Sequence, residues 1–478
     1  MTLVVPLGFG PDETQHAFRA YQLSLGQLFP QVINCATHPH LMPCRGNPRH
    51  GHLLAKQRAG GMLPISLVRV FSYLYHHSHN RRGIAHQFDP RSYAPLLAAT
   101  FGGSRLIYAH FENTALYSPA NYLPQIVVFW IARNVGEPIV ATLFTVRLVG
   151  GLVWAVLVSA AVAIVPRWKW LFSLVVLVPT ALAQGSAISA DSLSLGLVAL
   201  SVAYALRLVD QDAAPSRRQI GLLALLGLLI GLLKFPLVLV VVAIVAIVWR
   251  VLGAGADRRR RAAFIGLPGL VAAAVWDIAS NAYFVPYRDV VYQQRARVNV
   301  SESGQEHHLI THFYDLPGLL WNTATHTGVF ELDQIVAQVG QMGLPEWFAI
   351  IWLVAFALLA CCSSEGGEPA RRVRGWIGGS LVVYWLATIV ALYVTWSAVG
   401  ASEISGMHGR YLTLVLILAV PLLAGLARAR FAISERSTGY ATMAISAIAA
   451  GALYAYTSSH YYGDAPWTAV AHVSSRLF

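Results

Sequence analysis

Charged residues are scarce in this sequence. Only 12% of its 478 residues are Asp, Glu, Lys or Arg, whereas 56% are hydrophobic, and the mean hydropathy is +0.56. A soluble domain of this size needs a more polar surface, so a soluble globular protein is excluded. Several apolar runs reach the roughly 20 residues that span a bilayer as a helix. They do not alternate apolar and polar residues, which excludes a membrane β-barrel. We therefore expect an all-α polytopic membrane protein.

Cysteine is equally rare, with four residues in the chain. Cys361 and Cys362 end an apolar run and are typical packing residues. Cys35 and Cys44 fall in a segment expected outside the membrane, where an oxidising compartment allows a disulfide between them. The sequence also has no glycine-rich phosphate loop, nucleophile elbow or dinucleotide fingerprint. No histidine spacing supports a defined zinc site.

Acidic residues are outnumbered, 22 against 34 Lys and Arg, which gives a net charge of +12. Nucleic-acid binding could explain such a balance, but most of the basic residues lie in short loops between apolar runs. This placement follows the positive-inside rule, so we expect no nucleic-acid partner. Five basic clusters alternate onto one side, which we assign as cytoplasmic. They lie at 167–169, 217–218, 258–261, 371–374 and 428–436.

Ten apolar runs predict membrane spans. They are 138–165, 169–186, 191–209, 219–233, 235–251, 263–282, 345–361, 376–399, 411–427 and 437–458. Two long segments without such runs fall on the outer side, and their length exceeds that of simple connections. We therefore divide the chain into five parts. These are an apolar stub that is the remnant of a further first span (1–10), a first external loop with amphipathic interface helices (11–137), the first part of the bundle (138–282), a second large external loop (283–344), and the rest of the bundle with an external tail (345–478).

The adjacent carboxylates Asp12 and Glu13 begin the first external loop, at the mouth of the predicted bundle. Such a pair could accept a proton from a hydroxyl or hold a divalent cation such as Mg²⁺ or Mn²⁺. Helix capping is the alternative, with Asp12 as the N-cap and Glu13 as a first-turn acid. Apolar residues then recur at helical spacing and predict an amphipathic helix along the membrane surface. They are Phe18, Tyr21, Leu25 and Leu28.

A polar turn between two predicted spans is the next candidate site. It contains Gln184, Ser186, Ser189 and Asp191. Ser189 or Asp191 alone would cap the following helix. The four together exceed what a cap requires and are equally compatible with an outward-facing polar pocket.

Two basic residues lie at the outer ends of predicted spans. Lys234 could extend its ammonium group to the membrane surface or contact a phosphate. Arg410 could anchor a span at the interface or bind a phosphate through two parallel hydrogen bonds. Arg147 and Asp277 lie within predicted spans, where ionisable residues are usually paired or functional.

Five segments, in order along the chain, together resemble a known family. Residues 11–23 (PDETQHAFRAYQL) resemble the opening motif of the bacterial membrane-protein family of unknown function 2142, in which the usual wording is Pro-Asp-Glu-Pro-x-His, an aromatic residue, then Arg-Ala. Thr14 stands where the family usually has proline. The other four segments are 117–125, 179–192, 233–236 and 409–411.

This family resembles a branch of the GT-C glycosyltransferase superfamily. The resemblance implies a multispanning enzyme of the bacterial inner (cytoplasmic) membrane, with its site on the outer face. It implies a polyprenyl-phosphate-linked sugar as donor, a glycan, lipid or protein as acceptor, and membrane lipid as surroundings. An acidic residue of the first external loop is expected at the reaction centre, as base or metal ligand. Asp12 and Glu13 occupy that motif position.

We therefore predict a membrane glycosyltransferase in which Asp12 and Glu13 are the catalytic residues and, if a metal is used, its ligands. The predicted substrate-binding residues are His16, Arg19, Tyr117, Gln184, Ser189, Asp191, Lys234, His408 and Arg410. Two alternatives stay open. A transporter or flippase of lipid-linked glycans would use Arg147, Asp277 and Lys234 along a pathway through the bundle. A non-catalytic scaffold for envelope assembly would use none of them in chemistry.

Overall fold

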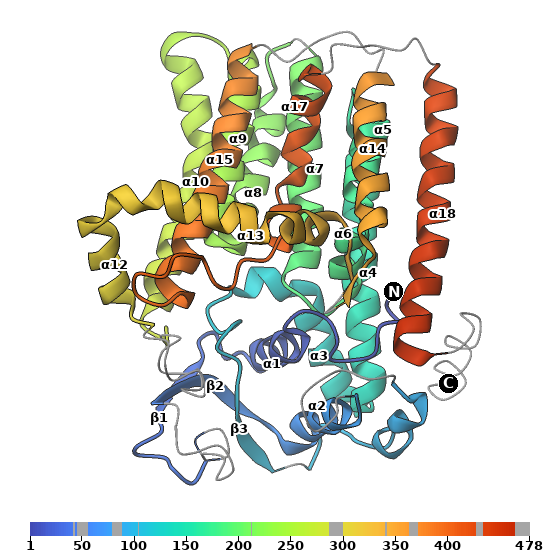
Figure 1. The fold of residues 1–478 in the computed structure, drawn as a ribbon, viewed down its shortest axis with the longest axis vertical. Helices are drawn as coiled ribbons and strands as arrows, with labels where there is room; N and C mark the ends of the chain where they lie inside the picture. The colour runs from blue at the N-terminus through green and yellow to red at the C-terminus, as the bar shows by residue number, and fades with distance from the viewer. Residues whose placement is uncertain are drawn as a thin grey trace.

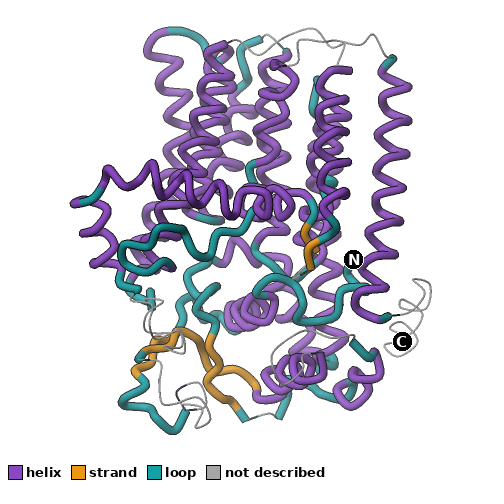
Figure 2. The backbone as a smooth tube through the Cα atoms, in the orientation of Figure 1, coloured by secondary structure: helices purple, strands orange, loops and turns teal. Residues whose placement is uncertain are grey.

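The computed structural model describes residues 1–41, 44, 56–78, 88–103, 105–211, 213–285, 300–339, 342–362, 371–426 and 434–463. Within these ranges the chain forms an upright bundle of helices with a smaller body at one end (Figure 1). We call this smaller body the cap; it comprises the described residues of 1–137. Figure 2 shows the strands gathered in the cap, apart from one short pair near the bundle.

Five helices of the bundle are long and apolar enough to cross a membrane. They are α4 (Ile139–Ile164), α7 (Asp191–Asp210), α10 (Gly255–Asn281), α15 (Arg371–Trp396) and α18 (Glu435–Tyr462). A sixth span results if α5 (Lys169–Val176) and α6 (Pro179–Ser186), which meet at a bend of 56°, count as one. The chain is thus a mostly helical, multi-pass membrane protein.

The expected count of about ten spans is not confirmed, although every predicted run contains helix. Three runs form helices that are short for a span: α8 (Arg217–Leu233), α9 (Val238–Val248) with its flanking 3₁₀ turns, and α14 (Glu346–Cys362). The run at 411–427 is interrupted. It forms α16 (Arg410–Thr413), a 3₁₀ turn at Leu416–Leu418, and α17 (Ala419–Leu426).

Helices α8 and α10 approach each other closely because glycines face each other across the contact. A Cβ atom placed on Gly231 would lie 2.1 Å from the carbonyl oxygen of Gly269, and one on Gly269 would lie 2.4 Å from that of Gly227. Small residues permit such backbone contact between membrane helices. α8 ends two residues later, at Leu233, because Pro236 has no backbone N–H to continue the helical hydrogen bonds and its ring would clash with the preceding turn. Lys234 therefore stands in extended chain at a firmly packed helix end.

The cap adds a small sheet to the helical architecture. Three antiparallel strands pair in the order β1 (Gln31–Asn34), β2 (Gln57–Pro64) and β3 (Leu106–His110). The helices of the cap are α1 (Glu13–Ser24), α2 (Ile65–Ser78), two 3₁₀ turns at Pro90–Leu96 and Pro119–Tyr122, and α3 (Leu123–Val135). The disulfide between Cys35 and Cys44, which the sequence allows but does not decide, is present.

The prediction that α1 lies along the membrane surface is wrong, because this helix is buried inside the cap. Phe18 packs edge-on against Phe71, with ring centroids 5.5 Å apart, and Tyr21 stacks on Phe101 at 5.1 Å. The helical spacing holds for Phe18 and Tyr21, whereas Leu25 and Leu28 follow the end of α1 at Ser24. The error lay in the surroundings, since a buried helix also shows an apolar face.

The described part of the segment between α10 and α14 forms two α-helices and a short strand pair. Helices α12 (Glu302–Thr311) and α13 (Leu316–Val336) are followed by the short strand pair β4 (Gln338–Val339) and β5 (Met342–Gly343). α13 runs across the upright helices on the side of the cap (Figure 1). The hydroxyl of Thr180 donates to the carbonyl of Gln334 at 2.9 Å, which joins the end of α13 to α6.

Candidate functional site

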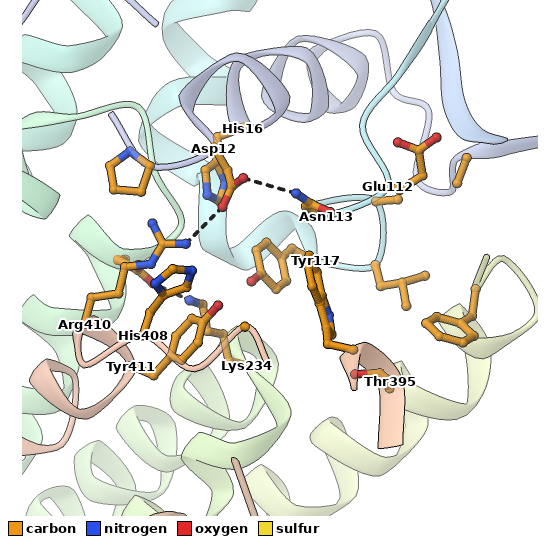
Figure 3. A pocket seen from close by; sticks show the side chains of 18 of the residues that line it. Asp12, His16, Glu112, Asn113, Tyr117, Lys234, Thr395, His408, Arg410 and Tyr411 are labelled. Atoms are coloured by element: carbon orange, nitrogen blue, oxygen red, sulfur yellow. Dashed lines mark hydrogen bonds and ion pairs between the residues drawn. The ribbon is translucent and has the colours of Figure 1, made fainter. Parts of the chain in front are cut away.

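A polar cavity of about 630 Å³ lies between the cap and the bundle. Its walls come from segments that are distant in sequence: the start of α1, the cap loop at 112–117, the first residue of α7, the end of α8, and residues 406–411. Figure 3 shows their side chains converging on one space. Asp12, Asp191, Lys234 and Arg410, which sequence analysis predicted separately, all line it. His16, Tyr117 and His408 do so as well.

Asp12 points its carboxylate into the cavity. One oxygen accepts a hydrogen bond from Nη2 of Arg410 at 3.0 Å, and the other accepts from Nδ2 of Asn113 at 3.1 Å (Figure 3). Asp12 precedes α1 but makes no side-chain capping bond, and its φ of 53° is left-handed. Aspartate tolerates that conformation better than most residues. Capping therefore does not account for this carboxylate.

The pKa of Asp12 lies below its ordinary value. Burial raises the pKa of this carboxyl, but the charge of Arg410 and the hydrogen bond from Asn113 outweigh burial and lower it. The side chain of Asp12 keeps 34% of its surface exposed. At neutral pH the cavity therefore contains an ionised carboxylate that a bound molecule can reach.

A second ion pair lies deeper in the cavity. Nζ of Lys234 donates to the Asp191 carboxylate, and the side chains are only 12% and 11% exposed. Nζ also lies 5.2 Å from the ring centre of Tyr117, within cation–π range. The Oγ of Ser189 accepts the backbone N–H of Asp191. Ser189 precedes the N-cap residue Ala190 and accepts the first backbone N–H of α7, while the side chain of Asp191 forms the ion pair.

His16 and His408 are neutral at physiological pH. Burial lowers the pKa of His16 to about 4, and burial followed by the charge of Arg410 lowers the pKa of His408. Nδ1 of His16 shares a hydrogen bond of 2.6 Å with the Tyr122 hydroxyl, and its ring stacks on Tyr117. Nδ1 of His408 is buried without a hydrogen-bond partner in the part of the chain that the structure describes.

Glu13 does not take part in the cavity, although it adjoins Asp12 in sequence. Its two oxygens accept five hydrogen bonds, two from Arg147 and three from the backbone N–H groups of residues 8, 10 and 188. Its side chain is fully buried. The geometry therefore argues against the predicted roles of Glu13 as base and as metal ligand, and makes it a structural residue.

Three of the predicted substrate-binding residues also lie outside the cavity lining. Arg19 is buried, and its guanidinium donates to the side chain of Gln22 and to the backbone carbonyls of residues 28 and 117. The Oγ of Ser189 accepts the first backbone N–H of α7. Gln184 is 3% exposed, and neither its amide nitrogen nor its amide oxygen has a partner within the described ranges. None of the three is among the residues that line the cavity.

Sequence reasoning missed several residues of the cavity. Asn113 and Glu112 come from a cap loop that carries no recognisable motif. Glu112 is itself paired, with Nδ1 of His110 at 2.9 Å and with Nη1 of Arg58 at 3.4 Å. Tyr411 follows Arg410 directly, within a segment already singled out for its family resemblance, and that position was a usable signal.

An apolar cavity of about 320 Å³ adjoins the polar one. It lies between α8, α10 and α15, and the two cavities share Leu116, Tyr117, Lys234 and Tyr411 as wall residues. Lys234 thus stands where polar and apolar spaces meet. Asp277 lines the apolar cavity, while Arg147 pairs with Glu13. These two ionisable residues of the predicted spans therefore do not pair with each other.

The predicted metal site finds no support in the arrangement of donors. Among the residues that the structure describes, no group of three or more His, Cys, Asp or Glu side chains is placed to hold a metal ion. Asp12 and Glu13 do not converge on a common point, because the Glu13 oxygens are occupied by Arg147 and the backbone. The pair therefore does not fit a shared divalent cation.

Comparison with known proteins identifies the family. No significant match was found among curated proteins or among solved structures. Residues 1–420 match the family described as "Predicted membrane protein (DUF2142)", which covers the cap, the cavity and most of the bundle. The chain therefore belongs to the DUF2142 family of predicted membrane proteins.

Proposed function

We propose that this protein is a GT-C-type glycosyltransferase of the bacterial inner membrane. It would transfer a sugar from a polyprenyl-phosphate donor to a glycan, lipid or protein acceptor on the outer face. One observation carries the proposal: the polar cavity combines an accessible carboxylate with two cations, and an apolar cavity adjoins it at Lys234. These are the groups that a sugar attached to a lipid phosphate would require.

The reaction would be a single displacement at the anomeric carbon. Asp12 takes the proton of the acceptor hydroxyl as its oxygen forms a bond to that carbon. The bond from the anomeric carbon to the phosphate oxygen breaks, and its electron pair leaves with the lipid phosphate. Arg410 and Lys234 stabilise the leaving phosphate, where negative charge develops. Attack opposite the leaving group inverts the anomeric configuration.

The apolar cavity supports a lipid-linked donor. Its walls include Leu233 and Pro236 near the end of α8, Ala273 of α10, and Leu392 of α15. A hydrocarbon chain in this space would place its phosphate beside Lys234 at the boundary with the polar cavity. The sugar would then extend into the polar space toward Asp12.

The outward-facing orientation is supported by charge placement. The four arginines at 258–261 lie in the first turns of α10, at the end of the bundle away from the cap (Figure 1). If the positive-inside rule holds here, that end is cytoplasmic and the cap faces outward.

The two alternatives receive less support. A transport pathway through Arg147 would require a cation free to meet a substrate, but its guanidinium is held by Glu13 and by backbone carbonyls. A scaffold without chemistry would not need the partly exposed Asp12 carboxylate between two hydrogen-bond donors.

The decisive experiment measures sugar release from a polyprenyl-phosphate-sugar by the purified protein in detergent, with a panel of donors and envelope acceptors. Asp12→Asn removes the proposed base and should lower the rate by about 10²- to 10⁴-fold, the usual contribution of a general base. Asp210→Asn is the matched control, because it removes a carboxylate from an ion pair with Arg167 outside the cavity lining. Full activity of Asp12→Asn would overturn the proposed role of this residue. No transfer with any donor would argue against the enzyme.

A further inference from the structure

The cations of the polar cavity are not free to receive a phosphate. Of the described residues that line it, Lys234 and Arg410 are the Lys or Arg residues, and each is already paired with a carboxylate. A phosphate that enters must therefore either share a cation with a carboxylate or displace that carboxylate. The two ion pairs differ in how readily they can open.

The pair of Lys234 with Asp191 is the fixed one. Both side chains are nearly buried, and both residues sit at the ends of packed helices, α8 and α7. Separating these charges would leave a carboxylate in an enclosed space without compensation, which is strongly unfavourable.

The pair of Arg410 with Asp12 is the labile one. A single contact of 3.0 Å joins Nη2 of Arg410 to one oxygen of Asp12, so the guanidinium does not bind the carboxylate through two parallel hydrogen bonds. Asp12 is 34% exposed, and its other oxygen is held by the exposed amide of Asn113. Water and Asn113 can therefore solvate the carboxylate after it leaves Arg410.

A phosphodiester is the better partner for this guanidinium. Its oxygens match the spacing of two guanidinium N–H groups and form paired, charge-assisted hydrogen bonds. We propose that the phosphate of the lipid-linked donor displaces Asp12 from Arg410, so that donor binding itself releases the base. This inference rests on the proposed function, because it assumes that the anion is the phosphate of the donor.

Two consequences follow for the reaction. Before donor binding, Asp12 is held as the counter-ion of Arg410 and is a weak base. After displacement it has lost that positive partner and faces a new negative charge, which strengthens it as a proton acceptor. Binding is therefore ordered, with the donor before the acceptor.

Loss of an ordinary binding residue weakens ligand binding, whereas displacement predicts that loss of the Asp12 carboxylate strengthens it. The probe is farnesyl methyl phosphate, a phosphodiester with a single negative charge, and farnesol is its uncharged control. Asp12→Asn removes the competing carboxylate and should tighten binding of the probe by about tenfold or more, since a like charge near the anion is removed. Binding of farnesol should not change. Affinities are measured by isothermal titration in detergent.

Further variants assign the effect to the ion pair. Arg410→Gln should weaken binding of the probe, and the double variant with Asp12→Asn should lose the gain, because no guanidinium is left to release. Asparagine suits the left-handed backbone at position 12. If Asp12→Asn does not fold, Asp12→Gly, which also accepts that conformation, replaces it.

The outcomes separate the inference from the proposed function. If the wild-type protein prefers the probe to farnesol but Asp12→Asn binds it equally or more weakly, displacement is overturned and the lipid-phosphate donor stands. If neither protein prefers the probe to farnesol, both the displacement and the proposed donor class are overturned. Displacement is supported if the single variant Asp12→Asn binds the probe more tightly than the wild-type protein and the double variant with Arg410→Gln does not.

Discussion

Two adjacent acids at the start of α1 each pair with an arginine, one in a sealed interior and the other at the cavity. Glu13 pairs with Arg147 on the sealed side, where its oxygens accept five hydrogen bonds. Asp12 pairs with Arg410 on the cavity side, through one contact of 3.0 Å. Glu13 is fully buried, whereas Asp12 is 34% exposed. An acid–arginine pair is thus structural or available for chemistry according to how completely its hydrogen bonds are satisfied.

Neutralising each acid in turn should give the largest difference in stability between the two ion pairs. Glu13→Gln leaves Arg147 buried without its counter-ion and should destabilise the protein by about 3–5 kcal/mol. Asp12→Asn changes a partly exposed pair and should alter stability by less than about 1 kcal/mol. Thermal unfolding in detergent measures both. Equal unfolding temperatures for the two variants would show that the sealed pair does not hold the fold.

Replacing each arginine by lysine tests geometry while keeping charge. Arg147 donates to both Glu13 oxygens and to the carbonyls of Thr2, Val5 and Pro6, which a lysine cannot reproduce. We expect Arg147→Lys to destabilise by about 2–4 kcal/mol and Arg410→Lys by under about 1 kcal/mol. The same unfolding assay applies. A larger effect of Arg410→Lys would reverse the assignment of the two sides.

Acid should affect the protein through His16, which lies on the cavity side. Its folded pKa of about 4 is below the ordinary 6.5. The unfolded chain therefore binds a proton first as pH falls, and stability is lost between pH 6.5 and about 4. At 1.36 kcal/mol per pKa unit, the loss amounts to about 3 kcal/mol.

The variant His16→Gln isolates this contribution, because glutamine does not titrate in this range. Its unfolding free energy should fall less than that of the wild-type protein across the same pH interval. Other buried histidines contribute in both proteins and cancel in the difference. Parallel curves for the two proteins would contradict the expectation.

The smallest expected effect concerns the second contact of Asp12. Asn113→Ala removes one exposed hydrogen bond, which is usually worth about 0.5–1.5 kcal/mol or less. The rate of transfer should fall by no more than about tenfold, with the unfolding temperature unchanged. A loss as large as that of Asp12→Asn would mean that Asn113 itself contacts the reacting groups.

Composition and hydropathy predicted the bundle well, because apolar runs of spanning length have few alternatives to helix. The span count was less secure. α14 is apolar but stops at 17 residues, α8 also stops at 17 residues, and the run at 411–427 breaks where its backbone turns at Leu416–Leu418. Hydropathy does not register where a helix ends. The sheet of the cap was also missed, because a short strand such as β1 has no distinctive pattern.

For the candidate site too, some of the residues predicted from the sequence line the cavity and others do not. Asp12, Asp191, Lys234 and Arg410 were selected by charge and position at the ends of spans, and the structure brings all four to one cavity. Glu13 was predicted together with Asp12, as the second carboxylate of the acidic motif. Its partner Arg147 lies 134 residues away, and adjacent residues at a helix start can face opposite directions. Pairings at such separation are set by tertiary packing, which one sequence does not reveal.

The hydrogen bonds from Arg147 to residues 2–6 have a consequence for biosynthesis. Its guanidinium holds the carbonyls of Thr2, Val5 and Pro6, yet the ribosome adds residue 147 long after those residues. The segment bearing Asp12 is made first but can be anchored only once α4 has been synthesised. Arg410 arrives later still, 398 residues after Asp12. The cavity can therefore be completed only after residue 410 has been synthesised, so the pairing of Asp12 depends on the late-made part of the bundle.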